Sequence, residues 1–357
     1  ICVAIPFAFR RVWAAAIPAL ALAVLIFFDL YAAATGQAAA VLSGPAWLRE
    51  HATAFAAVTE QAAGGRVIAL GPGMEGFANA GMRTGLPGAD SVSPLDGGQA
   101  RWRAALLEGI AAKPDDPGKA LVARRLLDLM AVRVVLASAD TALFPKEGAG
   151  PPLRLARRYG PLGVYVNDTA LPRAYWSPGW SVAPNISETF GMLSKPEFDT
   201  AKVCLIQPSA RGYQALVTNA PEAGLSANPS ASVGGPGASA IPATEEAGEP
   251  ARPGALCSIE EDLPEQVSLR VNAPRAGVVV LADSFAPGWR ATCDGAAVEV
   301  LRVNGLFRGV PVSAGAHKIV FTYRPLSIYA GIGVAAAALL ILAGGLIAAP
   351  FYARKKG

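Results

Sequence analysis

Two apolar runs decide the fold: VWAAAIPALALAVLIFFDLYAAA (residues 12–34) and LSIYAGIGVAAAALLILAGGLIAAPFYA (residues 326–353). A helix of about 20 apolar residues crosses the hydrocarbon core of a bilayer and satisfies its own backbone hydrogen bonds there. Both runs reach that length. The sequence therefore predicts two transmembrane helices, with the lipid bilayer as a partner.

Basic residues flank each run on one side only. Arg10 and Arg11 precede the first, and Arg354, Lys355 and Lys356 follow the second. Because short flanks rich in Lys and Arg stay in the cytoplasm, both ends are expected inside and residues from about 35 to 325 outside. Residues 1–9 are also apolar, and we expect them to be the end of an earlier transmembrane helix cut short; a cleaved signal peptide is the alternative.

The expected outer part of the chain is neutral. Of 31 Lys and Arg, five lie in the basic flanks, and of 27 Asp and Glu, only Asp29 lies in an expected span. A nucleic-acid binder would carry a basic surface, so that class is excluded. An ionisable residue in a span either lies near the interface or lines a polar site, and both readings stay open for Asp29.

Composition divides the outer part into two. Residues 220–254 consist mostly of Pro, Gly, Ala and Ser, and such a stretch buries too little apolar surface to order itself. We expect a flexible linker or insertion there. It separates an expected domain at 37–219 from a second at 255–325.

The first outer domain mixes helical and strand patterns. An apolar strand follows a helix directly in 118–131 and 132–137, which is typical of an α/β layer. The full prediction is helices at 45–63, 98–110 and 118–131, strands at 66–70, 132–137 and 203–206, and a hairpin at 153–159 and 163–167.

The sequence of the second outer domain predicts mostly β-strands. Val267, Leu269 and Val271 alternate with polar residues, residues 278–281 are a continuous apolar run, and residues 318–323 close the series. Asp294-Gly295 and Asn304-Gly305 are dipeptides of tight hairpins. About seven short strands predict a small antiparallel β-sandwich. The fold class expected is a membrane-anchored α+β protein.

The sequence contains no convincing motif for binding a cofactor or a metal ion. Gly71, Gly73 and Gly76 form G-x-G-x-x-G after a strand, but Pro72 removes an amide and further Gly and Pro interrupt any following helix, so no dinucleotide site is expected. With only two histidines and no C-x-x-C spacing, no metal site or cofactor is expected. His317 is expected to cap a turn or pack at a sheet edge.

Two further groups of residues are candidates for a structural or binding role. Cys204 and Cys257 lie in strands on either side of 220–254, where a disulfide would clamp its ends; separate buried thiols are the alternative. Aromatic rings often stack on sugars, which makes a group in a Pro- and Gly-bearing stretch candidates for carbohydrate binding, with core packing as the alternative. The carbohydrate-binding candidates are Trp176, Trp180, Tyr175 and Arg173.

Several motifs occur in an order that resembles the C-terminal region of bacterial YfhO-type membrane proteins. They are LADSFAPGWRA (281–291), NGLFRGV (304–310), Gly315-Ala316-His317 and Tyr323-Arg324-Pro325, with LLDLMAVR (126–133), Asn167 and LPRAY (171–175) upstream.

The resemblance implies a multi-pass protein of the bacterial plasma membrane, similar to the GT-C glycosyltransferases. Such enzymes use a polyprenyl-phosphate sugar to glycosylate an envelope polymer or lipid. Their catalytic carboxylate usually lies in an early outer loop, which this sequence does not include, so the chain alone is expected to be inactive. The alternative is a non-catalytic, membrane-anchored carbohydrate-binding or envelope-assembly module.

Overall fold

The computed structural model describes residues 58–62, 64–70, 88, 97–110, 116–140, 143, 152–207, 256–327, 329–337 and 340. The chain forms two compact units, one of residues 53–324 and one of residues 1–52 with 325–357. Several predictions fall outside the described residues: the segment 1–9, the span 12–34 with Asp29, the glycines at 71, 73 and 76, and the stretch 220–254.

In the second unit, the described residues from 326 onward are helical. Their large apolar side chains are open to solvent, with Leu326 74% and Val334 72% exposed. Within the described part of the chain, no helix has both the length and the apolar character needed to span a membrane. Most of the expected span beyond residue 337 lies outside the described residues.

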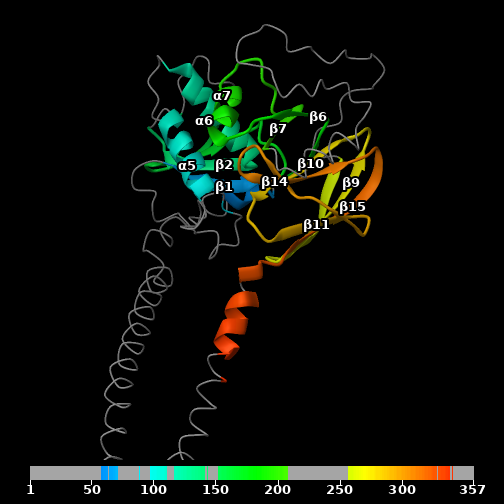
Figure 1. Ribbon diagram of the computed structural model, residues 1–357. Helices are drawn as coiled ribbons and strands as arrows, with labels where there is room; N and C mark the ends of the chain where they lie inside the picture. The colour runs from blue at the N-terminus through cyan, green and yellow to red at the C-terminus, as the bar shows by residue number, and fades with distance from the viewer. Residues whose placement is uncertain are drawn as a thin grey trace, which may run out of the picture. The chain divides into compact units, whose positions relative to one another are not determined.

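A four-stranded sheet and two helices form the first layer of residues 53–324 (Figure 1). The strand β2 (Val132–Ser138) pairs in parallel with β1 (Arg66–Ala69) and antiparallel with β4 (Leu162–Val166). Asp116 caps the N-terminus of helix α6 (Pro117–Leu129) by accepting a hydrogen bond from the Lys119 amide. After this helix, Ala131 adopts φ 60° and turns the chain into β2. The sheet order is β1-β2-β4-β3, and the remaining elements are β3 (Arg154–Tyr159) and α5 (Gly97–Ile110). These elements confirm the predicted α/β layer.

A six-stranded sheet forms the centre of the unit. Its order is β5-β10-β14-β13-β7-β6, where β6 and β7 are parallel and all other pairs are antiparallel. The strands are β5 (Ala174–Ser177), β6 (Gly179–Val182), β7 (Val203–Gln207), β10 (Gly277–Ser284), β13 (Leu301–Val303) and β14 (Phe307–Val312).

This sheet corrects the predicted division into outer domains at 37–219 and 255–325. The strands β5, β6 and β7 precede residues 220–254, yet β5 pairs with β10 and β7 pairs with β13, which follow it. Backbone hydrogen bonds therefore join the two ranges into one compact unit.

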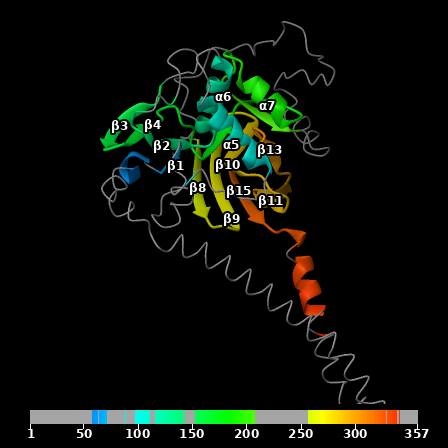
Figure 2. The same cartoon turned by 90° about the vertical axis from the view of Figure 1, so that its left-hand side faces the viewer.

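A five-stranded antiparallel sheet completes the unit (Figure 2). The sheet order is β12-β11-β15-β9-β8, with β8 (Cys257–Asp262), β9 (Gln266–Ala273), β11 (Trp289–Cys293), β12 (Ala296–Val298) and β15 (Gly315–Tyr323). The hairpin prediction is confirmed in both larger sheets: Asp294 turns the chain from β11 to β12 in this sheet, and Asn304 turns it from β13 to β14 in the six-stranded sheet. Both residues adopt φ 52°, and each precedes a glycine with positive φ.

The central sheet is buried on both faces, and β10 shows how. Val278, Val280 and Ala282 pack toward the cluster that includes the helices, whereas Val279 and Leu281 pack against the five-stranded sheet. Successive side chains of a strand point to opposite faces. A strand that is buried between two cores therefore has apolar residues at every position. Two sheets pack face to face here, but they do not form the predicted antiparallel β-sandwich of residues 255–325 alone. One layer includes β5, β6 and β7 from the preceding range, and β6 and β7 are parallel.

Candidate functional site

One carboxylate gathers three arginines at the end of β10. Asp283 follows the apolar run of that strand, and its side chain is 13% exposed. It accepts hydrogen bonds from Arg173 Nε and Nη2 and from Arg308 Nη2, each at 2.9 Å, and a further one from Arg66 Nη2. We call Asp283, Asp262 and these three arginines the Asp283 cluster.

The Asp283 cluster connects all three sheets. Arg66 is the first residue of β1, Arg308 lies on β14 beside β10, and Arg173 immediately precedes β5. Arg173 also donates from Nη2 to Asp262 at 3.0 Å, and Asp262 is the last residue of β8. The cluster therefore holds the four-stranded, six-stranded and five-stranded sheets to one another.

Burial and charge act in opposite directions on the pKa values of the cluster. Burial raises the pKa of Asp283, but hydrogen bonds from Arg173 and the charges of the three arginines outweigh it and lower that pKa to about 2. Burial lowers the pKa of Arg308 to about 10, against the attraction of Asp283. Both groups are therefore charged at neutral pH, and three cations face two carboxylates.

Aromatic rings cover Arg308. Its guanidinium lies 3.6 Å from the centroid of the Trp289 ring and 5.4 Å from that of Phe321. Tyr323 in turn packs on Trp289 with 5.0 Å between ring centroids. Among the described residues, Arg308 Nε and Nη1 are buried without a hydrogen-bond acceptor, so the rings are their main contact.

The cluster can position groups but is poorly suited to proton transfer. A general base needs a free lone pair and a pKa near the working pH. Asp283 accepts four hydrogen bonds from arginines, and its pKa lies well below neutrality. The arrangement is thus a clamp between layers, in which three arginines hold two carboxylates.

A second polar contact fixes the turn after β13. Asn304 is 1% exposed; its Oδ1 accepts from the Leu205 amide at 2.8 Å, and its Nδ2 donates to Tyr175 Oη at 3.2 Å. A third contact joins α6 to the end of β4, where the buried Arg124 donates to Asp128 at 2.7 Å and to Asn167 at 2.6 Å. Motif residues of both ranges therefore form internal contacts.

The carbohydrate-binding candidates separate in the structure. Tyr175 is 0% and Trp176 8% exposed, because β5 packs one side chain into each of the two cores. Stacking on a sugar needs an accessible ring face, so the prediction is corrected for these two residues. Arg173 belongs to the Asp283 cluster, and Trp180, which is half-buried on β6, remains a prediction.

The predicted disulfide is wrong, since Cys204 and Cys257 are both free thiols. Cys204 lies on β7 in the core beside the helices, whereas Cys257 lies on β8 and packs against the core between the two larger sheets. The two strands belong to different sheets, which separates the thiols. The alternative of separate thiols is confirmed.

Sequence reasoning missed Arg66, Asp283 and Arg308 as members of one site. The available signal was a charge placed directly after a buried run, at Asp283, and another inside a strand, at Arg308. A charged residue in such a position needs an oppositely charged or hydrogen-bonding partner, but its position in the sequence does not identify that partner.

Asp283, Trp289 and Arg308 all lie within residues 259–335, which match the family model described as bacterial membrane protein YfhO. Residues 259–335 are a YfhO-type region. The YfhO-type region runs from β8 into the exposed helix after β15, and it supports a membrane location for the chain. No curated protein and no solved structure matches the chain.

Proposed function

We propose that the chain is part of a bacterial membrane glycosyltransferase, which transfers a sugar from a polyprenyl-phosphate donor to a polymer or lipid of the cell envelope. The observation that carries the proposal is the match of residues 259–335 to the YfhO membrane proteins. The apolar runs 12–34 and 326–353 act as membrane anchors, with residues 35–325 outside. The exposed apolar side chains after Pro325 suit a helix that faces lipid.

In this proposal, residues 53–324 position a substrate and the catalytic carboxylate lies outside the described residues. The resemblance places the catalytic carboxylate elsewhere, and Asp283 does not replace it, because its hydrogen bonds all come from arginines and its pKa is lowered to about 2. Such a group stabilises the packing of the sheets rather than taking a proton from an acceptor hydroxyl.

Trp180 is the residue we assign to sugar contact. It lies on β6, an edge strand of the six-stranded sheet, where it packs against the core and is partly exposed. Stacking of an indole on a sugar ring contributes about 1 kcal/mol, so its loss lowers transfer roughly fivefold.

The test uses membranes that contain the full-length protein, supplied with labelled polyprenyl-phosphate sugars. We expect transfer with at least one donor, a several-fold lower rate for Trp180→Ala, and an unchanged rate for Tyr159→Ala. Tyr159 is a matched control because it is a half-buried aromatic residue of β3, in a different sheet. Equal rates for wild type and Trp180→Ala would remove Trp180 from the site.

The Asp283 cluster, whose buried carboxylate is poorly suited to proton transfer, also favours a second candidate: a membrane-anchored carbohydrate-binding or envelope-assembly module without catalysis. The two candidates differ in the same assay. Absence of transfer with every donor, in membranes where the protein is well expressed, would reject the glycosyltransferase and support the module.

A further inference from the structure

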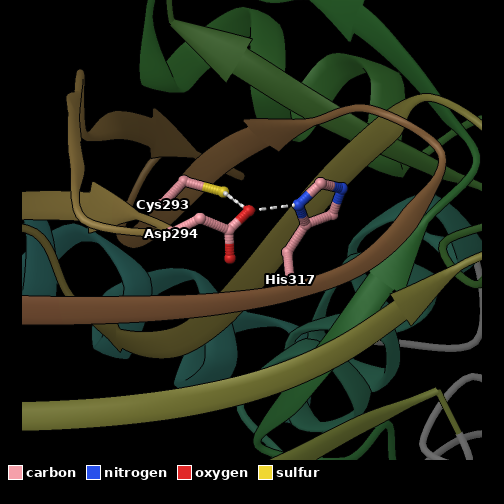
Figure 3. A group of neighbouring side chains, drawn as sticks. All are labelled: Cys293, Asp294 and His317. Carbon is pink, nitrogen blue, oxygen red and sulfur yellow. Dashed lines mark hydrogen bonds and ion pairs between the residues drawn. The ribbon is translucent and has the colours of Figure 1, made fainter.

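Three potential metal ligands meet at the turn after β11, although the sequence predicts no metal site (Figure 3). Cys293 pairs with Ile319 across β11 and β15, and His317 lies two residues before Ile319. Paired residues and residues two apart in a strand share a face, so Cys293 and His317 point to the same side. Asp294 adopts φ 52°, which turns its side chain toward them.

The distances are close to those of a tetrahedral site. Cys293 Sγ lies 3.8 Å from Asp294 Oδ2, and all three ligand atoms lie within 4.8 Å of one another. In a tetrahedral zinc site, sulfur and oxygen ligands are about 3.6 Å apart, and nitrogen and oxygen ligands about 3.3 Å. Asp294 Oδ2 and His317 Nδ1 are 2.7 Å apart, so a rotation of one side chain would open the site.

The surrounding contacts orient two of the ligands. His317 Nε2 lies 3.2 Å from the carbonyl oxygen of Ser313, which can accept its hydrogen and leave Nδ1 for a metal. Asp294 Oδ1 accepts a hydrogen bond from the Lys318 amide at 2.8 Å. Its Oδ2 faces Cys293 Sγ and His317 Nδ1, and a bound ion would replace these two contacts. These contacts hold the ligands between the turn after β11 and the neighbouring strand β15.

We propose that Cys293, Asp294 and His317 bind one zinc ion through Sγ, Oδ2 and Nδ1. Zinc accepts sulfur, nitrogen and oxygen ligands together, and three protein ligands leave a fourth position for water. The Asp294 side chain is 53% exposed, which gives the ion a path from solvent. On binding, the thiol of Cys293 releases its proton to solvent and its sulfur becomes a thiolate ligand.

The test is metal binding by the full-length protein in detergent with a reductant, and it does not depend on transfer activity. We expect one zinc ion per chain after equilibrium dialysis for wild type and for Cys257→Ser. Loss of a ligand, in Cys293→Ser, Asp294→Asn or His317→Gln, should weaken zinc binding at least tenfold. Cys257→Ser is the matched control because Cys257 is another half-buried free thiol of the same sheet.

Cobalt(II) supplies a second measurement. We expect the visible bands of a tetrahedral site and a thiolate-to-cobalt charge-transfer band that disappears in Cys293→Ser. Far-ultraviolet circular dichroism checks the fold, and Asp294→Asn keeps both a side-chain oxygen for Lys318 and a residue that tolerates positive φ. Wild type that binds no more zinc than Cys293→Ser, cobalt bound without the thiolate band, or equal loss in Cys257→Ser would overturn the proposal.

Discussion

Arg308 lies over the ring of Trp289, with 3.6 Å between the guanidinium carbon and the ring centroid. The two residues belong to different sheets, since Arg308 is on β14 and Trp289 begins β11. The same guanidinium donates to Asp283 at 2.9 Å. Arg308 is therefore held between a π face and a carboxylate, and it links the two layers of the sandwich.

Replacing Arg308 by lysine tests this link. A lysine ammonium lacks the planar fork that stacks on Trp289 while it bonds Asp283, so we expect the free energy of unfolding to fall by about 2–3 kcal/mol. Urea unfolding of the detergent-solubilised protein, followed by far-ultraviolet circular dichroism, measures it. Arg302→Lys is the control, because Arg302 lies 4.8 Å over Phe285 and is only half-buried. Equal losses in both variants would show that the Asp283 contact adds nothing.

The charge of Asp283 predicts a pH dependence of stability. Its pKa is about 2 in the folded protein, below the ordinary value of 3.8. The ionised carboxylate therefore stabilises the fold fully above pH 3.8, and the contribution is lost as the pH falls through 2. The difference in pKa corresponds to roughly 2 kcal/mol.

The measurement compares wild type with Asp283→Asn by urea unfolding from neutral pH down to pH 2. We expect Asp283→Asn to be the less stable protein at neutral pH and the gap to narrow in the acid range. Asp140→Asn is the control, because Asp140 pairs with Arg158 while its side chain is 72% exposed. A gap that stays constant with pH would contradict the assigned charge.

The turn at Asn304 offers a comparison of two residues with the same backbone angle. Asn304 and Asp294 both have φ 52°, but Asn304 makes two buried side-chain hydrogen bonds. Alanine at either position carries the same backbone strain and removes the side-chain acceptor of one backbone amide. The Leu205 amide bonded to Asn304 is buried, whereas the bond from the Lys318 amide to Asp294 is exposed, where water can replace it. We expect Asn304→Ala to cost about 2 kcal/mol more than Asp294→Ala in urea unfolding with a chelator present. Equal costs would mean that the Leu205 amide finds another acceptor.

Local patterns in the sequence predicted local structure well. Helix α6 and strand β2, the β3–β4 hairpin and both Asx-Gly turns depend on neighbouring residues, and all of them are present. The strands β5 and β6 were missed, because the proline and glycine around Trp176 resemble a loop. Only pairing with Val279 of β10, far along the chain, makes Trp176 a strand residue.

The candidate site was harder to predict because its members are distant in sequence. Arg66 and Arg173 are 217 and 110 residues from Asp283. No rule based on sequence spacing predicts a contact between such distant positions. Each residue taken alone looks like an ordinary charged side chain. The ligands of the proposed zinc site show the same limit, since His317 meets Asp294 only after β11 and β15 pair.

The mixed order of strands in the central sheet also has a consequence for biogenesis. The Leu205 amide of β7 finds its side-chain acceptor, Asn304, 99 residues later in the chain. At ordinary rates of synthesis, ribosomes need about 5 to 20 seconds to add that length. During this interval β7 has been made and its neighbour β13 has not, so the edge of β7 that pairs with β13 has no partner strand until the last third of the chain is being made.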